Sequence, residues 1–230
     1  MRTYRIGIRL IQLSAGLALI VLIAGFFGVW GERTTEQESE SPRDPIPQET
    51  IPWSNPKIVA LGDSFTQGYP LEESQSWPKR LADVLHVEVV NKGKGQQTSS
   101  DLLARFEADV IDENPGRVII FAGIGDAIQE VPLEDTKASI QAMVEKAKEA
   151  KIVPILALPI SYQGFQQSIT ATRDWEIEYA LIEGIITIDF SEVLFDEDGK
   201  FISTLVSSNE KYPNAKGYEK MGDYAAQILK

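Results

Sequence analysis

The chain has 230 residues, with 22 Lys and Arg against 34 Asp and Glu, one His and no Cys, for a net charge of −12 at pH 7. Hydrophobic residues make up 43% and charged residues 24%, which is typical of a globular protein. The acidic balance argues against nucleic-acid binding. The absence of Cys excludes disulfides, Cys-ligated zinc, iron–sulfur clusters and a Cys nucleophile, and a single His leaves little for a metal site, so we expect no metal.

Residues 1–31 predict a signal-anchor transmembrane segment. Three arginines precede an uncharged run over 10–31, and as a helix this run is about 33 Å long, enough to cross a hydrocarbon core of about 30 Å. The positive-inside rule places the N-terminus in the cytoplasm and the remainder outside the cell, which predicts a single-pass protein of the cell membrane. The alternative is a signal peptide whose cleavage releases a secreted domain.

Residues 32–56 predict a disordered tether. Five of the chain's 12 prolines fall in this stretch, mixed with Glu, Ser, Thr and Gln, and such a composition cannot bury enough apolar surface to fold. Five of the Lys and Arg and six of the Asp and Glu precede Lys57, so residues 57–230, with 17 against 28, carry about −11. We expect these residues to form the folded domain.

Short apolar runs alternate with helical patterns from Lys57 onward. Uninterrupted apolar runs are typical of parallel strands covered on both faces. The predicted strands are 58–61, 87–90, 117–122, 152–158 and 185–189. Helical spacing of apolar residues marks four regions, around 81–85, 102–110, 140–147 and 218–229. The pattern predicts an α/β fold, a doubly wound three-layer α/β/α domain with a parallel five-stranded sheet.

The segment 159–184 is the longest predicted connection, and it would rim the carboxyl edge of the sheet, where such folds bind ligands. Tyr162, Phe165 and Trp175 are candidates for a ligand rim, with packing inside a helix or loop as the alternative. His86, the only histidine, precedes the second strand and therefore belongs at the opposite, amino edge. We expect His86 to be a surface or packing residue.

A serine follows the first strand directly, in the sequence Gly62-Asp63-Ser64. A Ser at this place lies at the carboxyl edge of the sheet, near a helix N-terminus whose free N–H groups can hold an oxyanion. The alternative is a serine that only caps the helix.

With three further blocks, this motif resembles the SGNH/GDSL serine hydrolases, a family of flavodoxin-like esterases and lipases, over about 57–230. The further blocks are Asn91 to Ser99 after the second strand, Gly123 to Asp126 after the third, and Asn209 to Tyr218 before the last helix. The four blocks stand in the order that the family has. The family's chemistry implies no metal and no organic cofactor.

In that family a Ser attacks an acyl carbonyl, and a His three residues after an Asp removes its proton. By resemblance Ser64 is the nucleophile, while Asn209 and Tyr212 stand at the positions of the Asp and the His. Gln96 and Gly125 stand at the positions of the oxyanion-binding Gly and Asn. Because a phenol has a pKa near 10, it is a poor base for Ser at pH 7. The resemblance therefore implies degenerate catalytic blocks.

Other residues could replace the missing base. Lys211, Lys92 or Lys94 could form a Ser–Lys dyad if burial removed its charge, with a solvated lysine as the alternative. Asp63 and Asp126 do not have the spacing of a paired-carboxylate site, and we expect Asp126 to cap the turn that follows it.

Three functions remain open. The first is a degenerate domain, anchored outside the membrane through residues 10–31, that binds an acyl-ester lipid, a glycan ligand or a protein partner. The second is an active serine esterase, lipase or deacetylase that uses a base other than His. The third is an envelope scaffold that does not need Ser64. The sequence identifies neither the substrate nor a protein partner.

Overall fold

The computed structural model describes residues 55–230. The membrane segment predicted at 1–31 and nearly all of the tether predicted at 32–56 lie outside the described residues. Among the helices of residues 55–230, none has the length and apolar character needed to span a bilayer.

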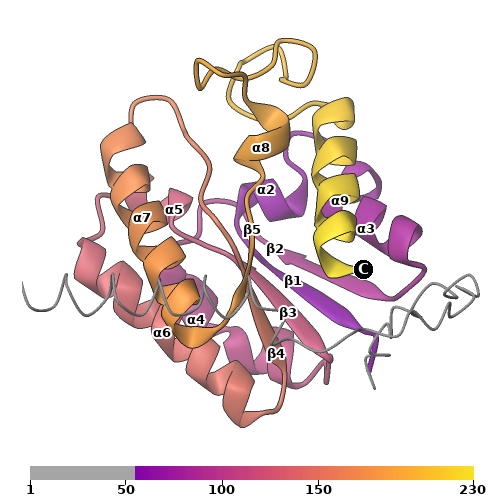
Figure 1. The fold of residues 1–230 in the computed structure, drawn as a ribbon, viewed down its shortest axis with the longest axis vertical. Helices are drawn as coiled ribbons and strands as arrows, with labels where there is room; N and C mark the ends of the chain where they lie inside the picture. Colours follow the sequence, from indigo (N-terminus) through magenta and orange to yellow (C-terminus); the bar gives the residue numbers. More distant parts are fainter. Residues whose placement is uncertain (1–54) are drawn as a thin grey trace, which may run out of the picture. The chain divides into compact units, whose positions relative to one another are not determined.

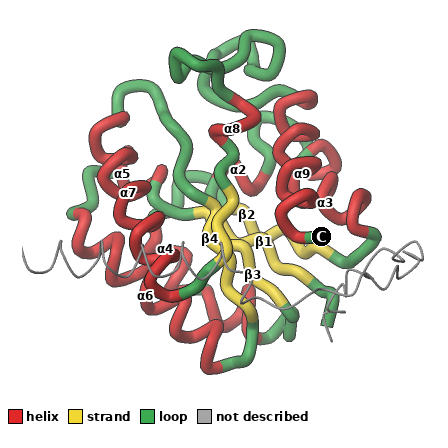
Figure 2. Tube along the Cα trace, in the orientation of Figure 1, coloured by secondary structure: helices red, strands yellow, loops and turns green. Residues whose placement is uncertain are grey.

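Five parallel strands form one sheet at the centre of the domain (Figure 2). They are β1 (Ile58–Gly62), β2 (Val89–Gly93), β3 (Arg117–Phe121), β4 (Val153–Ala157) and β5 (Ile186–Ile188). Their order is β2-β1-β3-β4-β5, and every neighbouring pair is parallel. The predicted sheet is thus confirmed. The second strand begins two residues later than predicted and continues to Gly93.

Helices cover both faces of the sheet (Figure 1). The longer ones are α3 (Trp77–Leu85), α4 (Ser99–Ala104), α6 (Leu133–Glu149), α7 (Gln166–Glu183) and α9 (Ala215–Leu229). The short ones are α2 (Ser64–Gln67), α5 (Ile124–Ile128), α8 (Ser191–Leu194), the 3₁₀ turn η1 (Glu73–Gln75) and the π-helical turn η2 (Glu107–Ile111).

Alternate residues of β1 enter the two cores. Ile58 and Ala60 pack with residues of α3 and α9, whereas Val59 and Leu61 pack with residues of α4, α6 and α7. All four side chains are fully buried. The apolar run therefore has no alternation because both of its faces are covered, as the three-layer prediction requires.

The helix before β2 has the ends that its sequence predicts. The Ser76 side chain accepts a hydrogen bond from the Lys79 N–H, and Pro78 lies in the first turn. His86 ends the helix in the left-handed conformation, with φ of 55°, and its side chain is exposed. Since β2 begins at Val89, His86 lies at the amino edge of the sheet, as predicted.

Residues 159–184 do connect β4 to β5, but residues 166–183 form the long helix α7, so the prediction that the whole segment rims the carboxyl edge is wrong for most of it. The buried face of α7 consists of Ile169, Thr172, Glu176 and Ala180. Their spacing is helical, but two of the four are polar, so an apolar pattern does not reveal the helix. The remaining loop, 158–165, follows β4 at the carboxyl edge.

Glu176 is a charged residue type in a fully buried position. Its side chain is 1% exposed, and its Oε2 has no hydrogen-bond partner within residues 55–230. Burial raises the pKa of Glu176 well above its ordinary value; Asp126 raises it further, whereas Arg173 opposes the shift. A raised carboxyl pKa favours the folded state below the unfolded pKa, and this stability is lost as pH rises through the folded pKa.

We therefore expect Glu176→Gln, which resembles the protonated acid, to stabilise the domain at pH 8 and to have little effect at pH 4. Each kcal/mol gained would raise the melting temperature by about 2–4 °C in a domain of this size. Thermal unfolding at both pH values measures the effect. Glu178→Gln is the matched control, because Glu178 is exposed on the same helix. A Glu176→Gln domain that melts below wild type at pH 8 contradicts this account.

Candidate active site

Ser64 begins the short helix α2 directly after β1, at the carboxyl edge of the sheet. Asp63 precedes it as the helix cap, and its Oδ1 accepts a hydrogen bond from the Phe65 N–H at 2.9 Å. The chain turns sharply here because Gly62 still belongs to β1 and Ser64 already belongs to α2. The Ser64 side chain is half-buried at the edge where the fold leaves room for a ligand.

Two adjoining cavities bring the predicted site residues together. A cavity of about 280 Å³ is lined by Ser64, Gln96, Gly125 and Tyr212, which come from four separate parts of the chain. A second cavity, of about 450 Å³, shares Ser64, Gln96 and Tyr212 with the first and also contacts Asn209. The blocks that the sequence placed after successive strands thus meet around Ser64.

Two backbone donors are available beside Ser64. The N–H groups of Ser64 and Gln96 have no hydrogen-bond partner within residues 55–230. Gln96 adopts the left-handed conformation, with φ of 61°, and its carbonyl accepts a hydrogen bond from the Gln129 side chain at 3.0 Å. Free N–H groups at the mouth of a cavity are the donors that a carbonyl oxygen or an oxyanion needs.

No side chain fits at position 125 with this backbone. A Cβ atom added to Gly125 would lie 1.9 Å from the carbonyl oxygen of Gln97, and backbone atoms cannot move away as a flexible side chain can. Gly125 is itself buried. The adjacent loop therefore occupies the space that a side chain at this position, predicted to correspond to the family's Asn, would need.

Asp126 holds that loop in place. Its Oδ2 accepts a hydrogen bond from the Ser99 N–H at 2.8 Å, and its Oδ1 accepts one from the Ser99 hydroxyl at 2.6 Å. The Thr136 hydroxyl donates to the same Oδ1 at 3.2 Å. The prediction that Asp126 caps the following turn is wrong, because its carboxylate instead joins α5 to the start of α4 and to α6.

Tyr212 packs among aromatic rings beside Ser64. Its ring centroid lies 5.0 Å from those of Phe65 and Tyr69 and 6.0 Å from that of Tyr162. Asn209, three residues earlier, is exposed; its Oδ1 accepts hydrogen bonds from the Ser207 hydroxyl and the Lys211 N–H, and no hydrogen bond joins Asn209 to Tyr212. The pair therefore lacks the orienting contact of an Asp–His pair.

The Ser64 hydroxyl has no hydrogen-bond partner among residues 55–230. A nucleophilic Ser normally contacts the group that takes its proton. Nothing in this part of the chain supplies that contact.

Two of the lysines proposed as a substitute base form ion pairs with carboxylates. Lys92 pairs with Glu113 at 2.8 Å, and Lys94 pairs with Asp109 at 3.1 Å. Neither lysine lines either of the two cavities that contain Ser64. Lys211 has no ion pair within the described residues and lines the 450 Å³ cavity together with Ser64.

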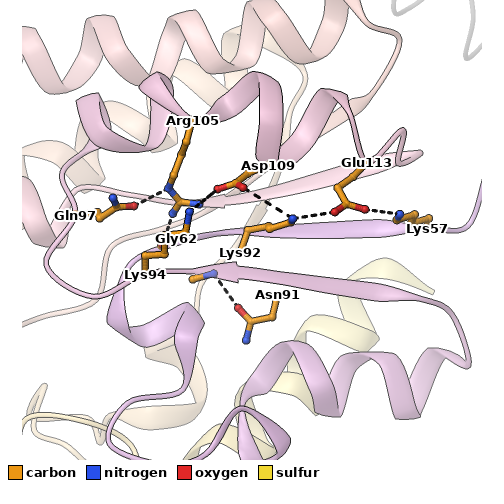
Figure 3. A network of polar contacts seen from close by, with 10 residues as sticks. Lys57, Gly62, Asn91, Lys92, Lys94, Gln97, Arg105, Asp109 and Glu113 are labelled. Atoms are coloured by element: carbon orange, nitrogen blue, oxygen red, sulfur yellow. Dashed lines mark hydrogen bonds and ion pairs between the residues drawn. The ribbon is translucent and has the colours of Figure 1, made fainter.

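These ion pairs belong to a network that also reaches the Ser64 turn (Figure 3). The Arg105 guanidinium donates to the Gly62 carbonyl at 3.0 Å, to the Gln97 side chain at 2.6 Å and to Asp109 at 2.5 Å. Arg105 thus ties the end of β1 to the loop after β2. Lys92 and Lys94 lie beside these Arg105 contacts, on the side of the sheet that α4 and η2 cover.

Asp63 is a candidate base that the sequence did not suggest. Its side chain is 4% exposed and lines the 280 Å³ cavity with Ser64. Burial raises the pKa of Asp63 to about 7, and the charge of Asp126 adds to the shift. The raised pKa of Asp63 could not be predicted from the sequence, because it comes from the burial of the side chain in the folded domain.

The aromatic rim candidates separate into two groups. Tyr162 lines the 450 Å³ cavity, and its ring lies 6.4 Å from that of Phe165, at the start of α7. Trp175 instead stacks on Tyr179 at 5.1 Å and packs against the core beside α6. Trp175 is therefore a packing residue, and Tyr162 remains a candidate for a ligand rim.

The sequence profile of the GDSL-like lipase/acylhydrolase family matches residues 60–220. A solved structure from Desulfitobacterium hafniense DCB-2, assigned to the lipolytic G-D-S-L family, is 51% identical, with a TM-score of 0.75 over 76% of this chain and 99% of that one. This match spans the length of the described domain.

Two curated relatives match more partially. The uncharacterized lipoprotein YqeF of Bacillus subtilis is 31% identical over 43% of this chain and 46% of that protein. The thioesterase 1/protease 1/lysophospholipase L1 of Escherichia coli is 29% identical over 46% of this chain and 53% of that protein. The chain thus spans about half the length of the curated relatives it matches.

The crowding at position 125 yields a test. We expect Gly125→Ala to lower the free energy of unfolding by roughly 1–3 kcal/mol, because its methyl group meets the Gln97 carbonyl. Gly95→Ala, in the loop that carries Gln97, is the matched control, since its Cβ would lie 3.4 Å from the flexible Gln67 side chain. Urea denaturation of both variants measures the difference. Equal stability of the two variants would mean that the loop moves freely away from position 125.

Proposed function

The chain belongs to the GDSL-like lipase/acylhydrolase family, and we propose that its domain binds an acyl ester at Ser64 without hydrolysing it at an enzymatic rate. One observation carries this proposal: the Ser64 hydroxyl makes no hydrogen bond to a base within residues 55–230, and Tyr212, packed among aromatic rings, is predicted to stand at the position of the family's His. Without a base, the serine remains an ordinary alcohol.

The magnitudes favour binding over turnover. A positioned general base typically contributes about 10²–10⁴ in rate. The loss of one oxyanion donor typically costs a further 10² to 10³, roughly. The N–H groups of Ser64 and Gln96 have no partner among residues 55–230, so they would be available to hold a carbonyl oxygen in the cavity. In this proposal the backbone N–H groups that would hold an acyl carbonyl oxygen are kept, whereas the residues that would activate the Ser64 hydroxyl are replaced.

We propose that this domain lies outside the cell membrane. The apolar run 10–31 would anchor the chain, and residues 32–56 would join this anchor to the domain. The similarity to a Bacillus subtilis lipoprotein supports an association with the cell envelope. An acyl-ester lipid or an acylated glycan would then be the ligand.

A second candidate function is a slow serine esterase, and the buried carboxyl of Asp63 favours it. With a pKa of about 7 and a place in the same cavity, Asp63 is half ionised near neutral pH and could accept a proton from Ser64. Turnover by this route would rise with pH through about 7 and disappear in Asp63→Asn. Lys211 is the other candidate base, by its position in the adjoining cavity.

Turnover and binding, measured on the same protein, test the proposal. With p-nitrophenyl butyrate we expect wild type and Ser64→Ala to hydrolyse ester at the same background rate. Octanamide, an acyl amide that resists hydrolysis, should still bind and shift the amide signals of Ser64 and Gln96 in ¹⁵N NMR spectra. Amide signals far from the cavity, such as that of Lys151, serve as the internal reference.

The double variant Asn209→Asp/Tyr212→His is the positive control, since it restores the family's base and its orienting acid. It should exceed wild type in turnover by at least about 10-fold, yet stay below a complete site because Gly125 still lacks the amide. Ser64-dependent turnover by wild type would overturn the binding proposal and establish the esterase. Absence of both turnover and octanamide binding would overturn both.

A further inference from the structure

Four large aliphatic side chains are exposed between residues 177 and 186. Leu181 is 82% exposed, Ile182 73%, Ile177 44% and Ile186 37%. The first three lie on the last two turns of α7, and Ile186 begins β5. We call these four residues the α7–β5 patch. Scattered exposed aliphatic side chains are ordinary, but three on two turns of one helix indicate a contact surface.

The patch lies toward the amino edge of the sheet, away from Ser64. The helix α7 leaves the carboxyl edge after β4 and runs back along the sheet to the start of β5 (Figure 1). At its end Glu183 pairs with Lys148 at 2.7 Å, and Lys148 lies in the last turn of α6, which leads into the start of β4. Both helices therefore end at the amino edge.

The chain also enters the domain at this edge. Lys57 precedes β1, and the Asn55 side chain donates to the Asn114 carbonyl in the turn before β3. Three strand spacings of about 4.8 Å separate β1 from β5, which places the entry point roughly 15 Å from the patch along the sheet. The patch thus shares an edge of the sheet with Asn55, the first described residue.

We propose that the α7–β5 patch rests on the lipid bilayer and holds the Ser64 cavity on the side that faces away from it. This inference rests on the proposed membrane anchor at 10–31. The 23 residues 32–54 would reach at most about 70 Å as a Pro-rich chain, so the domain stays near the bilayer. At such a short range even a weak apolar contact is populated, because tethering raises its effective concentration to the millimolar range.

A bilayer fits the patch better than a second copy of the chain does. A stable protein interface buries about 20–30 residues on each side, whereas the patch has four. The strand β5 beside it has only three residues, which is short for pairing between two sheets. Since residues 57–230 carry about −11, we expect the contact to be apolar and not electrostatic.

This orientation decides which esters reach Ser64. With 18 residues, α7 is about 27 Å long, and Ser64 lies near the opposite edge of the sheet from the end of α7. The cavity then opens well above the headgroups, on the aqueous side. An ester embedded in the same bilayer cannot reach it, whereas an acyl group on a soluble or surface glycan can. The glycan ester is therefore the ligand class that this geometry favours.

Single cysteines provide the test, because the chain has none of its own. Leu181→Cys places an environment-sensitive nitrobenzoxadiazole label on the patch. Gln167→Cys is the matched control, exposed on the same helix at its other end. The full-length protein is reconstituted into phosphatidylcholine vesicles that contain nitroxide-labelled lipid. We expect the label at 181 to be quenched at least about threefold more than the label at 167.

Flotation of the vesicles distinguishes failure of the proposed anchor from failure of the proposed patch contact. A full-length chain that does not float with the vesicles overturns the proposed anchor and this inference together. Flotation with equal quenching of both labels overturns the inference alone. A label at 181 that escapes lipid quenching but shifts its emission as protein concentration rises points to a second copy on the patch and also overturns it.

Discussion

The contact between Asp126 and Ser99 fixes the geometry of the site. Two hydrogen bonds, at 2.6 and 2.8 Å, hold the loop after β2 against the start of α5. In this position the Gln97 carbonyl occupies the space above Gly125 that a Cβ atom would need. The same loop carries Gln96, which lines the cavity of Ser64 and whose N–H has no partner among residues 55–230. One carboxylate thus holds a loop that lines the cavity and excludes a side chain from position 125.

This packing gives the proposed degeneracy of the site a structural reason. An Asn at position 125 would require the loop that carries Gln97 to move first. Tyr212 is likewise held in place, because its ring packs on Phe65 and Tyr69. Both residues are thus parts of a packed surface around Ser64. Such a surface is consistent with the proposed recognition of an acyl group without its hydrolysis.

The fold was predictable because the central strands β1 and β3 are buried on both faces. The run from Ile58 to Leu61 is uniformly apolar, and the structure divides these residues between two cores. The helix α7 was not predictable in the same way, since Thr172 and Glu176 interrupt its apolar face. A buried Glu looks like a surface residue in a sequence, and its environment appears only once the helix is packed.

The sequence predicted which residues meet at the site, but not the raised pKa of Asp63 or the ion pairs near Ser64. Motif order brought Ser64, Gln96 and Tyr212 to one cavity, because successive parallel strands end at the same edge. The raised pKa of Asp63 and the ion pairs of Lys92 and Lys94 depend on burial and on long-range neighbours. These properties do not follow from residue spacing. They decide which groups near Ser64 are able to take a proton.

Intact-mass analysis after treatment with a fluorophosphonate tests most directly whether Ser64 is activated. The reagent adds to a serine only when a base makes its oxygen nucleophilic. With wild type and Ser64→Ala, and with the Asn209→Asp/Tyr212→His variant as the reactive control, we predict a mass shift on that control alone. A shift on wild type that Ser64→Ala abolishes would contradict the account, and Asp63 and Lys211 would then be the residues to substitute.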